Sequence, residues 1–431
     1  MSRAAERQSL PEPEPAVDGR RQVLAWAFYD WGNSAFATTV MAGFFPVFFK
    51  QYFSAGSDAA DSTLRLGLAN SVASVLVAAA APLLGAIADR SSAKKRFVGG
   101  FAALGAVMTA ALYLVGRGQW QLAAACYVAA AVGFSGSIVF YDSLLVAVAP
   151  AAERDRVSAL GYGLGYLGGG LLLAVNVAMT LWPARFGLSD AAEAVRVAFM
   201  TVALWWALFT LPLLLWVREP AASASASIGG TFRDAARQLS TTLRRVRELP
   251  QVWTFLLAYW LYIDGVDTII RMAVDYGLAL GFDSGSLITA LLLTQFVGFP
   301  AAIAFGWLGQ RVGSRRGILL GLAVYLGVTV YGYALETEAE FYGLAVVIGL
   351  VQGGVQALSR AFYSRLIPAE EAAEFFGFYN MLGKFAAILG PALMGWVSVA
   401  TGSPRLSILA IALLFLAGGA LLLRVPAPYQ Q

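Results

Sequence analysis

The sequence contains no histidine and only one cysteine, Cys126. Without histidine, a histidine-based metal site, catalytic triad or proton relay is excluded, and a single cysteine cannot form an internal disulfide. The glycine-rich nucleotide loop of ATP-driven pumps is also missing, which excludes primary ATP-driven transport on this chain. Because no metal-ligand spacing and no nucleophile–base pair occurs, we expect no metal, no cofactor and no enzymatic activity.

Charged residues are scarce as well. They make up 13% of the chain, against about 25% in an average soluble domain, while 59% of the residues are hydrophobic. Apolar runs of about 20 residues recur, and each is long enough to cross roughly 30 Å of hydrocarbon. The buried strands of a soluble α/β enzyme run only about 4–8 residues, so the sequence predicts an all-α membrane protein.

The apolar runs predict about twelve transmembrane helices in two six-helix bundles. We place them at 24–49, 64–88, 97–116, 120–148, 157–181, 196–217, 251–276, 285–309, 317–335, 341–364, 374–399 and 405–424. An even number puts both termini on one side, and most lysines and arginines outside the spans fall on that side. Because short cytoplasmic loops attract positive charge, we expect a multi-pass protein with both termini in the cytoplasm.

The tail and the linker complete the predicted organisation. The tail, residues 1–22, is polar and lacks the apolar core of a signal peptide, and the excess of arginine over lysine is typical of GC-rich bacteria. We therefore expect a bacterial inner-membrane protein with a cytoplasmic tail at 1–22, a six-helix bundle at 23–217, a cytoplasmic linker at 218–250, a second bundle at 251–425 and a short tail at 426–431.

Apolar residues recur at helical spacing within the linker, opposite a basic face. This pattern favours an amphipathic helix on anionic membrane lipids, and a plain charged linker is the alternative. The apolar residues are Phe232, Ala236, Leu239, Leu243 and Val246.

The two halves of the chain resemble each other. "LAWAFYDWGNS" at 24–34 aligns with "LAYWLYIDGVD" at 257–267, and "GAIADRSSAKKR" at 85–96 aligns with "GWLGQRVGSRRG" at 306–317. Repeated six-helix halves are typical of alternating-access transporters, which hold a small-molecule substrate at the interface between the repeats. The sequence therefore predicts a secondary transporter.

The stretch "GAIADRSSAKKR" resembles the G-x-x-x-D-R-x-G-R-K/R motif of the major facilitator superfamily. A carboxylate and several cations at the cytoplasmic rim can make contacts in one state that break in the other. The second copy has Gln310 where an aspartate is expected, so we expect a weaker latch there. A positive-inside loop alone would explain the cations, but the repeated placement favours a cytoplasmic gate. Its predicted residues are Gly85, Asp89, Arg90, Lys94, Lys95, Arg96, Arg311, Arg315 and Arg316.

Four other stretches carry a more specific resemblance. "WAFYDWGNSAF", "VFYDSLL", "LVQGGVQALSRAF" and "EFFGFYNMLGKFAAILGP" resemble the vacuole effluxer-like family of that superfamily, which includes bacterial permeases and the fungal vacuolar amino-acid effluxer. They fall in the first, fourth, tenth and eleventh predicted spans, so the resemblance covers most of the chain. It implies the major facilitator fold, with amino acids as the first candidate cargo. The seventh span departs from the family pattern at Asp267 and Arg271.

Ionisable residues inside the spans supply the candidate site, because each would cost roughly 2.5–3.5 kcal/mol or more at mid-bilayer if it faced lipid. Nearly all lie in spans one, four, seven and ten, which in the superfamily line the central cavity. At 1.5 Å per residue, Asp30, Asp142 and Arg360 lie about 6–10 Å from the cytoplasmic boundary. The candidate substrate-binding or coupling residues are Tyr29, Asp30, Asn33, Tyr141, Asp142, Asp264, Asp267, Arg271, Gln352, Gln356, Arg360, Asn380 and Lys384.

Several of these assignments have a structural alternative. A cytoplasmic gate or a fold-stabilising ion pair would account equally well for Asp30, Asp142 and Arg360. The pair Asp267 and Arg271 has the i,i+4 spacing at which two charges in one helix neutralise each other. Asp264 lies near the midplane, where we favour substrate binding or proton coupling.

We therefore predict alternating-access transport of a small polar solute, with protons as the candidate coupling ion. We expect a monomer among membrane lipids and no nucleic-acid partner. An exporter of drugs or amphiphiles, and a non-transporting sensor of the same fold, are the alternatives. The G-x-G-x-x-G match at 163–168 has no preceding strand and lies inside a span, so its glycines favour helix packing over nucleotide binding.

Overall fold

The structure is a computed structural model that describes residues 16–57, 59–91, 93–219, 244–385 and 389–426. Within these residues it is helical and contains no strand. The first half of the chain forms α1 (Ala16–Ala35), η1 (Phe36–Phe44), α2 (Phe45–Phe48), η2 (Phe49–Phe53), α3 (Ala59–Ser91), α4 (Lys94–Ala111), η3 (Leu112–Leu114), α5 (Trp120–Val148), η4 (Ala151–Glu153), α6 (Arg154–Leu181), η5 (Pro183–Phe186) and α7 (Ala191–Trp216).

The second half repeats this pattern of long helices. It forms α9 (Pro250–Ala279), α10 (Ser284–Val312), α11 (Ser314–Tyr333), α12 (Glu338–Leu366), η6 (Ala369–Glu371), α13 (Ala372–Phe385), α14 (Leu389–Thr401) and α15 (Pro404–Arg424). Among the described residues, 10 stretches of helix are long and apolar enough to cross a membrane. The two other predicted spans correspond to α9, which carries several charges, and to α13 with α14.

The first predicted span is not a regular α-helix throughout. It begins as α1, widens into the π-helical turns of η1 at Phe36, and ends in further π-helical turns at η2. Pro46 lies in the short α2 between them and has no N–H to donate to the preceding turn. The sequence pattern of apolar residues gave no sign of these wider turns, because apolar periodicity does not separate one helix type from the other.

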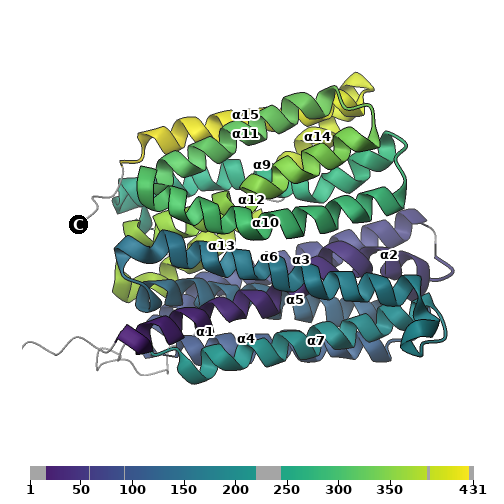
Figure 1. Ribbon diagram of the computed structural model, residues 1–431, viewed down its shortest axis with the longest axis horizontal. Coiled ribbons are helices and arrows are strands. Elements are labelled where there is room, and N and C mark those ends of the chain that lie inside the picture. Colours follow the sequence, from purple (N-terminus) through teal and green to yellow (C-terminus); the bar gives the residue numbers. More distant parts are fainter. Residues whose placement is uncertain (1–15, 58, 92, 220–243, 386–388, 427–431) are drawn as a thin grey trace, which may run out of the picture.

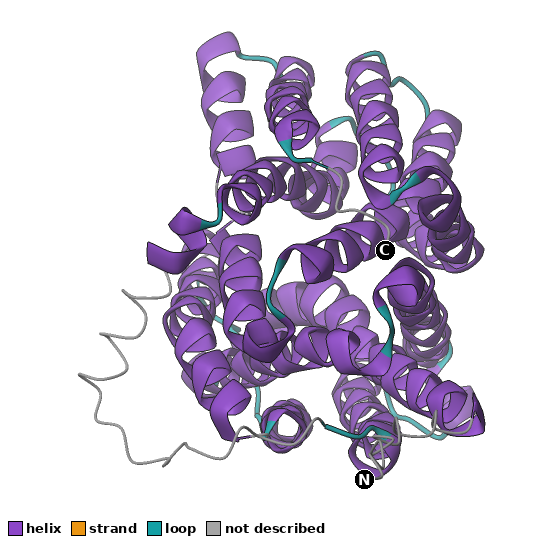
Figure 2. Cartoon of the chain, turned by 90° about the vertical axis from the view of Figure 1, so that its left-hand side faces the viewer, coloured by secondary structure: helices purple, strands orange, loops and turns teal. Residues whose placement is uncertain are grey.

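The long helices form two bundles that lie side by side, α1–α7 and α9–α15 (Figure 1). Between the bundles, α6 packs along α10 and α12, and α13 packs against α3 and α5. Helix α1 begins and α15 ends at the same end of the molecule, which we call the termini end and which faces the viewer in Figure 2. This arrangement confirms the predicted fold class.

Close packing between the bundles depends on small residues at defined positions. A Cβ added at Gly85 of α3 would lie 2.3 Å from the Ala373 carbonyl oxygen of α13. Such a contact is well inside van der Waals distance, so only glycine at position 85 allows these two helices to approach as they do.

Most of the predicted linker helix lies outside the described residues, including Phe232, Ala236, Leu239 and Leu243. Residues 244–248 are described and helical, and Val246 is fully buried. The side chain of Arg245, which lies shortly before α9 in the sequence, forms an ion pair with Glu371 of η6.

Candidate functional site

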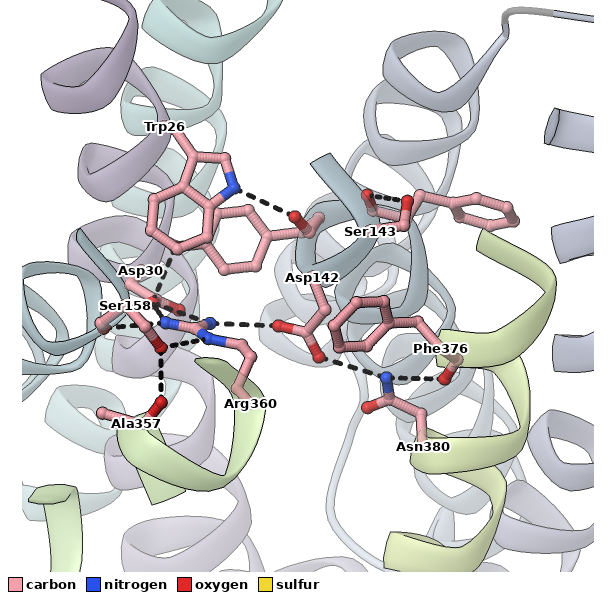
Figure 3. A network of polar contacts seen from close by, with 11 residues as sticks. Trp26, Asp30, Asp142, Ser143, Ser158, Ala357, Arg360, Phe376 and Asn380 are labelled. Atoms are coloured by element: carbon pink, nitrogen blue, oxygen red, sulfur yellow. Dashed lines mark hydrogen bonds and ion pairs between the residues drawn. The ribbon is translucent and has the colours of Figure 1, made fainter. Parts of the chain in front are cut away.

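Arg360 of α12 lies at the centre of a polar cluster between the two bundles. It is 1% exposed, and its guanidinium reaches across the interface into the first bundle. Its Nη1 donates to Asp142 Oδ1 at 3.0 Å and lies 3.5 Å from Asp30 Oδ2. Its Nε donates to Ser158 Oγ at 2.8 Å, and its Nη2 donates to the Ser158 carbonyl at 2.9 Å (Figure 3). Among the described residues, every hydrogen bond from this guanidinium ends on the opposite bundle.

Aromatic rings complete the surroundings of Arg360. Its guanidinium carbon lies 4.4 Å from the ring centroid of Tyr162, 4.8 Å from that of Trp26 and 5.4 Å from that of Tyr141. The electron-rich faces of such rings attract a cation, and more strongly where water is excluded. All three rings belong to the first bundle, as do both carboxylates.

Contacts within the first bundle hold this arrangement in place. The Tyr141 hydroxyl donates to Asp30 Oδ2 at 2.7 Å, and Trp26 Nε1 donates to the Tyr141 carbonyl at 2.9 Å. The rings of Trp26 and Tyr141 stack with centroids 4.5 Å apart. A Cβ at Gly161 of α6 would lie 2.7 Å from Asp30 Oδ2, so the glycine leaves room for the carboxylate.

The charges in this cluster do not balance. Two carboxylates face one guanidinium, and Asn380 of α13 is the further donor to Asp142, at 3.1 Å. Buried charges cost several kcal/mol each unless they are paired, so separating Arg360 from Asp30 and Asp142 requires compensation by a ligand or by protons. Of the predicted site residues, the structure thus brings together Asp30, Tyr141, Asp142, Arg360 and Asn380.

A second interbundle contact lies nearer the termini end. Arg365 of α12 pairs with Asp155 of α6 at 2.8 Å, and the Ser314 hydroxyl of α11 donates to the same carboxylate at 2.8 Å. Arg154 Nη1 donates to the Ser364 carbonyl at 2.8 Å. Gln310, which replaces the aspartate in the second motif copy, makes only a long contact here: its amide nitrogen lies 3.5 Å from the Ala152 carbonyl oxygen. The carboxylate on this side comes from α6, not from the motif.

The first motif copy connects α3 with α13. Both carboxylate oxygens of Asp89 accept backbone N–H groups at the start of α13, from Ala373 at 3.1 Å and Glu374 at 2.8 Å. Lys94 lies 2.7 Å from the same carboxylate. Burial raises the pKa of Asp89, although Lys94 and the two N–H groups act in the opposite direction. The N-terminus of a helix carries partial positive charge and attracts a carboxylate, so Asp89 caps α13 from the other bundle.

The remaining predicted gate residues are placed as follows. Lys95 Nζ donates to the Val217 carbonyl at 2.6 Å, and Arg315 Nη1 donates to the Val425 carbonyl at 2.6 Å, so each holds the end of its own bundle. Arg96, Arg311 and Arg316 are exposed. The side chain of Arg90 lies outside the described residues, as do those of Arg271 and Lys384 from the candidate site.

Asp264 of α9 accepts backbone N–H groups at the beginning of α14. Its Oδ1 accepts the Gly390 N–H at 2.7 Å and its Oδ2 accepts the Leu389 N–H at 3.0 Å, at the start of α14. Thr268 also donates to this carboxylate, at 3.2 Å, and Asp264 is fully buried. The predicted span at 374–399 covers α13 and α14, and Asp264 accepts the first two N–H groups of α14. Asp267 is half-buried in the same helix as Asp264.

The other predicted residues lie beside the cluster or beyond it. Tyr29 is fully buried and its ring packs 4.9 Å from that of Tyr141, whereas Gln356 is half-buried. Asn33 is 2% exposed, and its Nδ2 has no hydrogen-bond partner within the part of the chain that the structure describes. Gln352 lines a cavity of about 110 Å³ inside the second bundle, whose walls are otherwise mostly apolar.

Sequence reasoning missed several residues of the cluster. Trp26 of α1 carried no site prediction, and neither did Ser158 and Tyr162 of α6, which lie in or beside its glycine-rich stretch. Asp155 lies in the predicted loop between the spans at 120–148 and 157–181 and carried no site prediction. Polar residues on α6 facing the tenth span could have drawn attention, because that helix borders the interface in any two-bundle arrangement of this kind.

The sequence is similar to those of known transporters and of fungal autophagy-related proteins. The model of the family described as vacuole effluxer Atg22 like matches residues 66–429. The uncharacterized MFS-type transporter YxiO of Bacillus subtilis (strain 168) is 37% identical over 94% of this chain and 95% of its own length. Autophagy-related protein 22-2 of Aspergillus clavatus is 26% identical over 60% of this chain, which spans only 46% of that relative.

Solved structures with the same fold are also transporters. The human organic anion transporter MFSD10 superposes with a TM-score of 0.73 and 17% identity, over 95% of this chain and 100% of that one. The major facilitator transporter FucP in an outward conformation gives a TM-score of 0.70 at 14% identity, over 94% of this chain and 98% of that one. At such identities the likeness shows the fold alone.

Proposed function

The chain belongs to the vacuole effluxer Atg22-like family and is a transporter of the major facilitator type, and we propose that it moves a small polar solute by alternating access. An amino acid or a similar metabolite is the leading candidate cargo. In this proposal the protein lies as a monomer in a bacterial inner membrane, and the termini end faces the cytoplasm, as the excess of positive charge on that side favours.

The observation that carries the proposal is the set of contacts made by Arg360. A buried guanidinium whose hydrogen bonds all end on the opposite bundle adds polar contacts to the helix packing that joins the two bundles. Such polar contacts can be broken more readily than apolar packing, because water, protons or a ligand can replace each partner. The Asp89 and Asp155 contacts add two further separable connections at the termini end.

Alternating access then follows from the balance between two arrangements of the bundles. With the termini end closed, as here, Arg360 neutralises charge on Asp30 and Asp142. Opening that end removes the cation from both carboxylates, so the open state needs a bound solute or a proton to offset the buried charge. A ligand that binds the open state better shifts the population toward it by its differential affinity.

Binding and flux measurements test this function. A panel of metabolites is screened for thermal stabilisation of the purified protein, because a ligand that binds only the folded state raises apparent stability. Stabilising compounds are then assayed for uptake into proteoliposomes, with and without a pH gradient. We expect saturable uptake of at least one polar solute, accelerated by the gradient if protons are coupled. Binding without uptake of any stabilising compound would contradict transport and favour a sensor.

An exporter of amphiphilic compounds is the second candidate, and one cavity favours it. The space of about 110 Å³ in the second bundle is lined by residues such as Ile269, Leu291, Phe341 and Ile348, with Gln352 as one of its few polar walls. Lipophilic compounds therefore belong in the same panel. Uptake of these compounds but of no polar solute would replace the first candidate with the second.

A further inference from the structure

We propose that the first bundle contains a binding site for an organic cation, which Arg360 occupies in this conformation. On this view the transported solute carries a guanidinium group that takes the place of Arg360 when the bundles part. The proposal rests on the proposed transport function, because it names the chemical class of the solute for the same interface.

Among the described residues, the groups that contact the Arg360 guanidinium all come from one bundle. They are Trp26 and Asp30 of α1, Tyr141 and Asp142 of α5, and Ser158 and Tyr162 of α6. We call these six residues the cation box. Arg360 belongs to α12 of the other bundle, so its guanidinium leaves the cation box when that bundle moves away.

The cation box is held together without Arg360. The hydrogen bonds from Tyr141 to Asp30 and from Trp26 to the Tyr141 backbone both lie inside the first bundle, as does the stacking of Trp26 on Tyr141. These contacts persist when the second bundle moves away. A preformed site of this kind binds a ligand without the cost of organising its own side chains.

The geometry of the cation box fits a planar guanidinium better than a point charge. Nε, Nη1 and Nη2 of Arg360 each reach a different acceptor: the Ser158 hydroxyl, the Asp142 carboxylate and the Ser158 carbonyl. Aromatic faces lie at 4.4 to 5.4 Å from the guanidinium carbon. A guanidinium presents donors in a fixed fork and stacks on rings, whereas an ammonium does neither in the same way.

Charge also selects the ligand class. Once Arg360 departs, the cation box holds two carboxylates and no cation among its six residues. An anionic solute would add to this negative charge, and a neutral one would leave it uncompensated. A cationic solute restores the charge that Arg360 supplied, and it therefore favours the state in which the bundles have separated at the termini end.

Chemical rescue of an emptied cation box tests the proposal. In the full-length Arg360→Ala protein, methylguanidinium at millimolar concentration should raise the melting temperature, whereas its neutral isostere methylurea should not. In the wild-type protein, whose cation box is occupied by Arg360, a rise of the same size should need about tenfold more methylguanidinium or more. Methylammonium tests whether charge alone suffices, and we expect it to rescue less than methylguanidinium does.

Two controls make the outcome decisive. The double variant Arg360→Ala with Asp142→Asn retains the space but loses a carboxylate, and it should lose the rescue. If Arg360→Ala does not fold, Arg360→Gln provides the emptied site instead. Equal effects of methylguanidinium and methylurea, or rescue that survives Asp142→Asn, would overturn the cation box.

Transport by the wild-type protein separates this proposal from the proposed function. We expect proteoliposomes to take up L-arginine in preference to L-citrulline, which has the same shape but no charge on its side chain. Saturable uptake of neutral solutes with no uptake of guanidinium compounds would overturn the solute class and leave the transport function standing. The absence of any solute flux would instead count against transport itself.

Discussion

At the scale of single residues, burial of a charge identified the candidate site but not its partners. Asp30, Asp142 and Arg360 were recognisable because charges are costly inside apolar spans, and the structure places all three in one cluster. The sequence left a gate, an ion pair and a substrate contact equally open, since partners more than 100 positions apart are brought together only by helix packing. Ser158 and Tyr162 were missed for the same reason.

Asp264 has a structural role that the sequence did not predict. The sequence placed it at the depth of a substrate site, but the structure uses both its oxygens to cap α14. A role of Asp264 in substrate binding or proton coupling stays a prediction.

The capping role of Asp264 predicts a specific pattern of stability. Asp264→Ala should destabilise the protein by about 0.5–2 kcal/mol, because it removes the acceptor for the first N–H groups of α14. Asp264→Asn retains an acceptor oxygen and should cost much less. Thermal unfolding of the two variants in the same detergent checks this. Equal destabilisation by alanine and asparagine would show that charge, and not capping, is what matters at this position.

At the scale of helices, the lengths of the apolar runs predicted which helices exist and in which order they follow. The predicted span at 120–148 coincides with α5, and the predicted span at 64–88 lies within α3 (Ala59–Ser91). One feature that depends on backbone geometry escaped prediction, namely the π-helical turns that begin at Phe36. These turns change the backbone hydrogen-bonding pattern without interrupting the apolar pattern on which the prediction relied.

The contact between α3 and α13 depends on the absence of a side chain at Gly85. A methyl group there would meet the Ala373 carbonyl, so Gly85→Ala should force the helices apart and weaken capping of α13 by Asp89. We expect this variant to expose the termini end. A reporter introduced as Ala372→Cys, at a fully buried position, should then react faster with a maleimide in a Cys126→Ala background.

A matched glycine variant controls for general destabilisation. A Cβ at Gly100 of α4 meets no atom within 4 Å, so Gly100→Ala should leave the reactivity at position 372 unchanged. If Gly85→Ala behaves like Gly100→Ala, close approach of α3 and α13 does not hold the termini end closed.

At the scale of the whole molecule, the proposed alternating access requires the two bundles to rock about the interface formed by α6 with α10 and by α3 with α13. The sequence supported this arrangement through its internal repeat and its asymmetric positive charge. It could not give the conformation, because closed and open states share the same helices. Polar contacts at the termini end, from Arg360, Asp155 and Asp89, define the state seen here.

Distances between the two bundles report directly on rocking. Spin labels at Ala152→Cys and Glu370→Cys, both exposed at the termini end, measure opening there in a Cys126→Ala background. A second pair, Arg117→Cys and Glu336→Cys, occupies exposed loops at the opposite end. Each pair has one label in either bundle, so a rigid-body movement changes both distances in opposite directions.

The decisive measurement is the distance distribution of both pairs in lipid, by double electron–electron resonance, with Arg360 intact and with Arg360→Ala. The account predicts that removal of Arg360 lengthens the distance at the termini end and shortens the distance at the opposite end. Unchanged distributions at both ends in the folded variant would contradict the claim that Arg360 joins the bundles in the closed state.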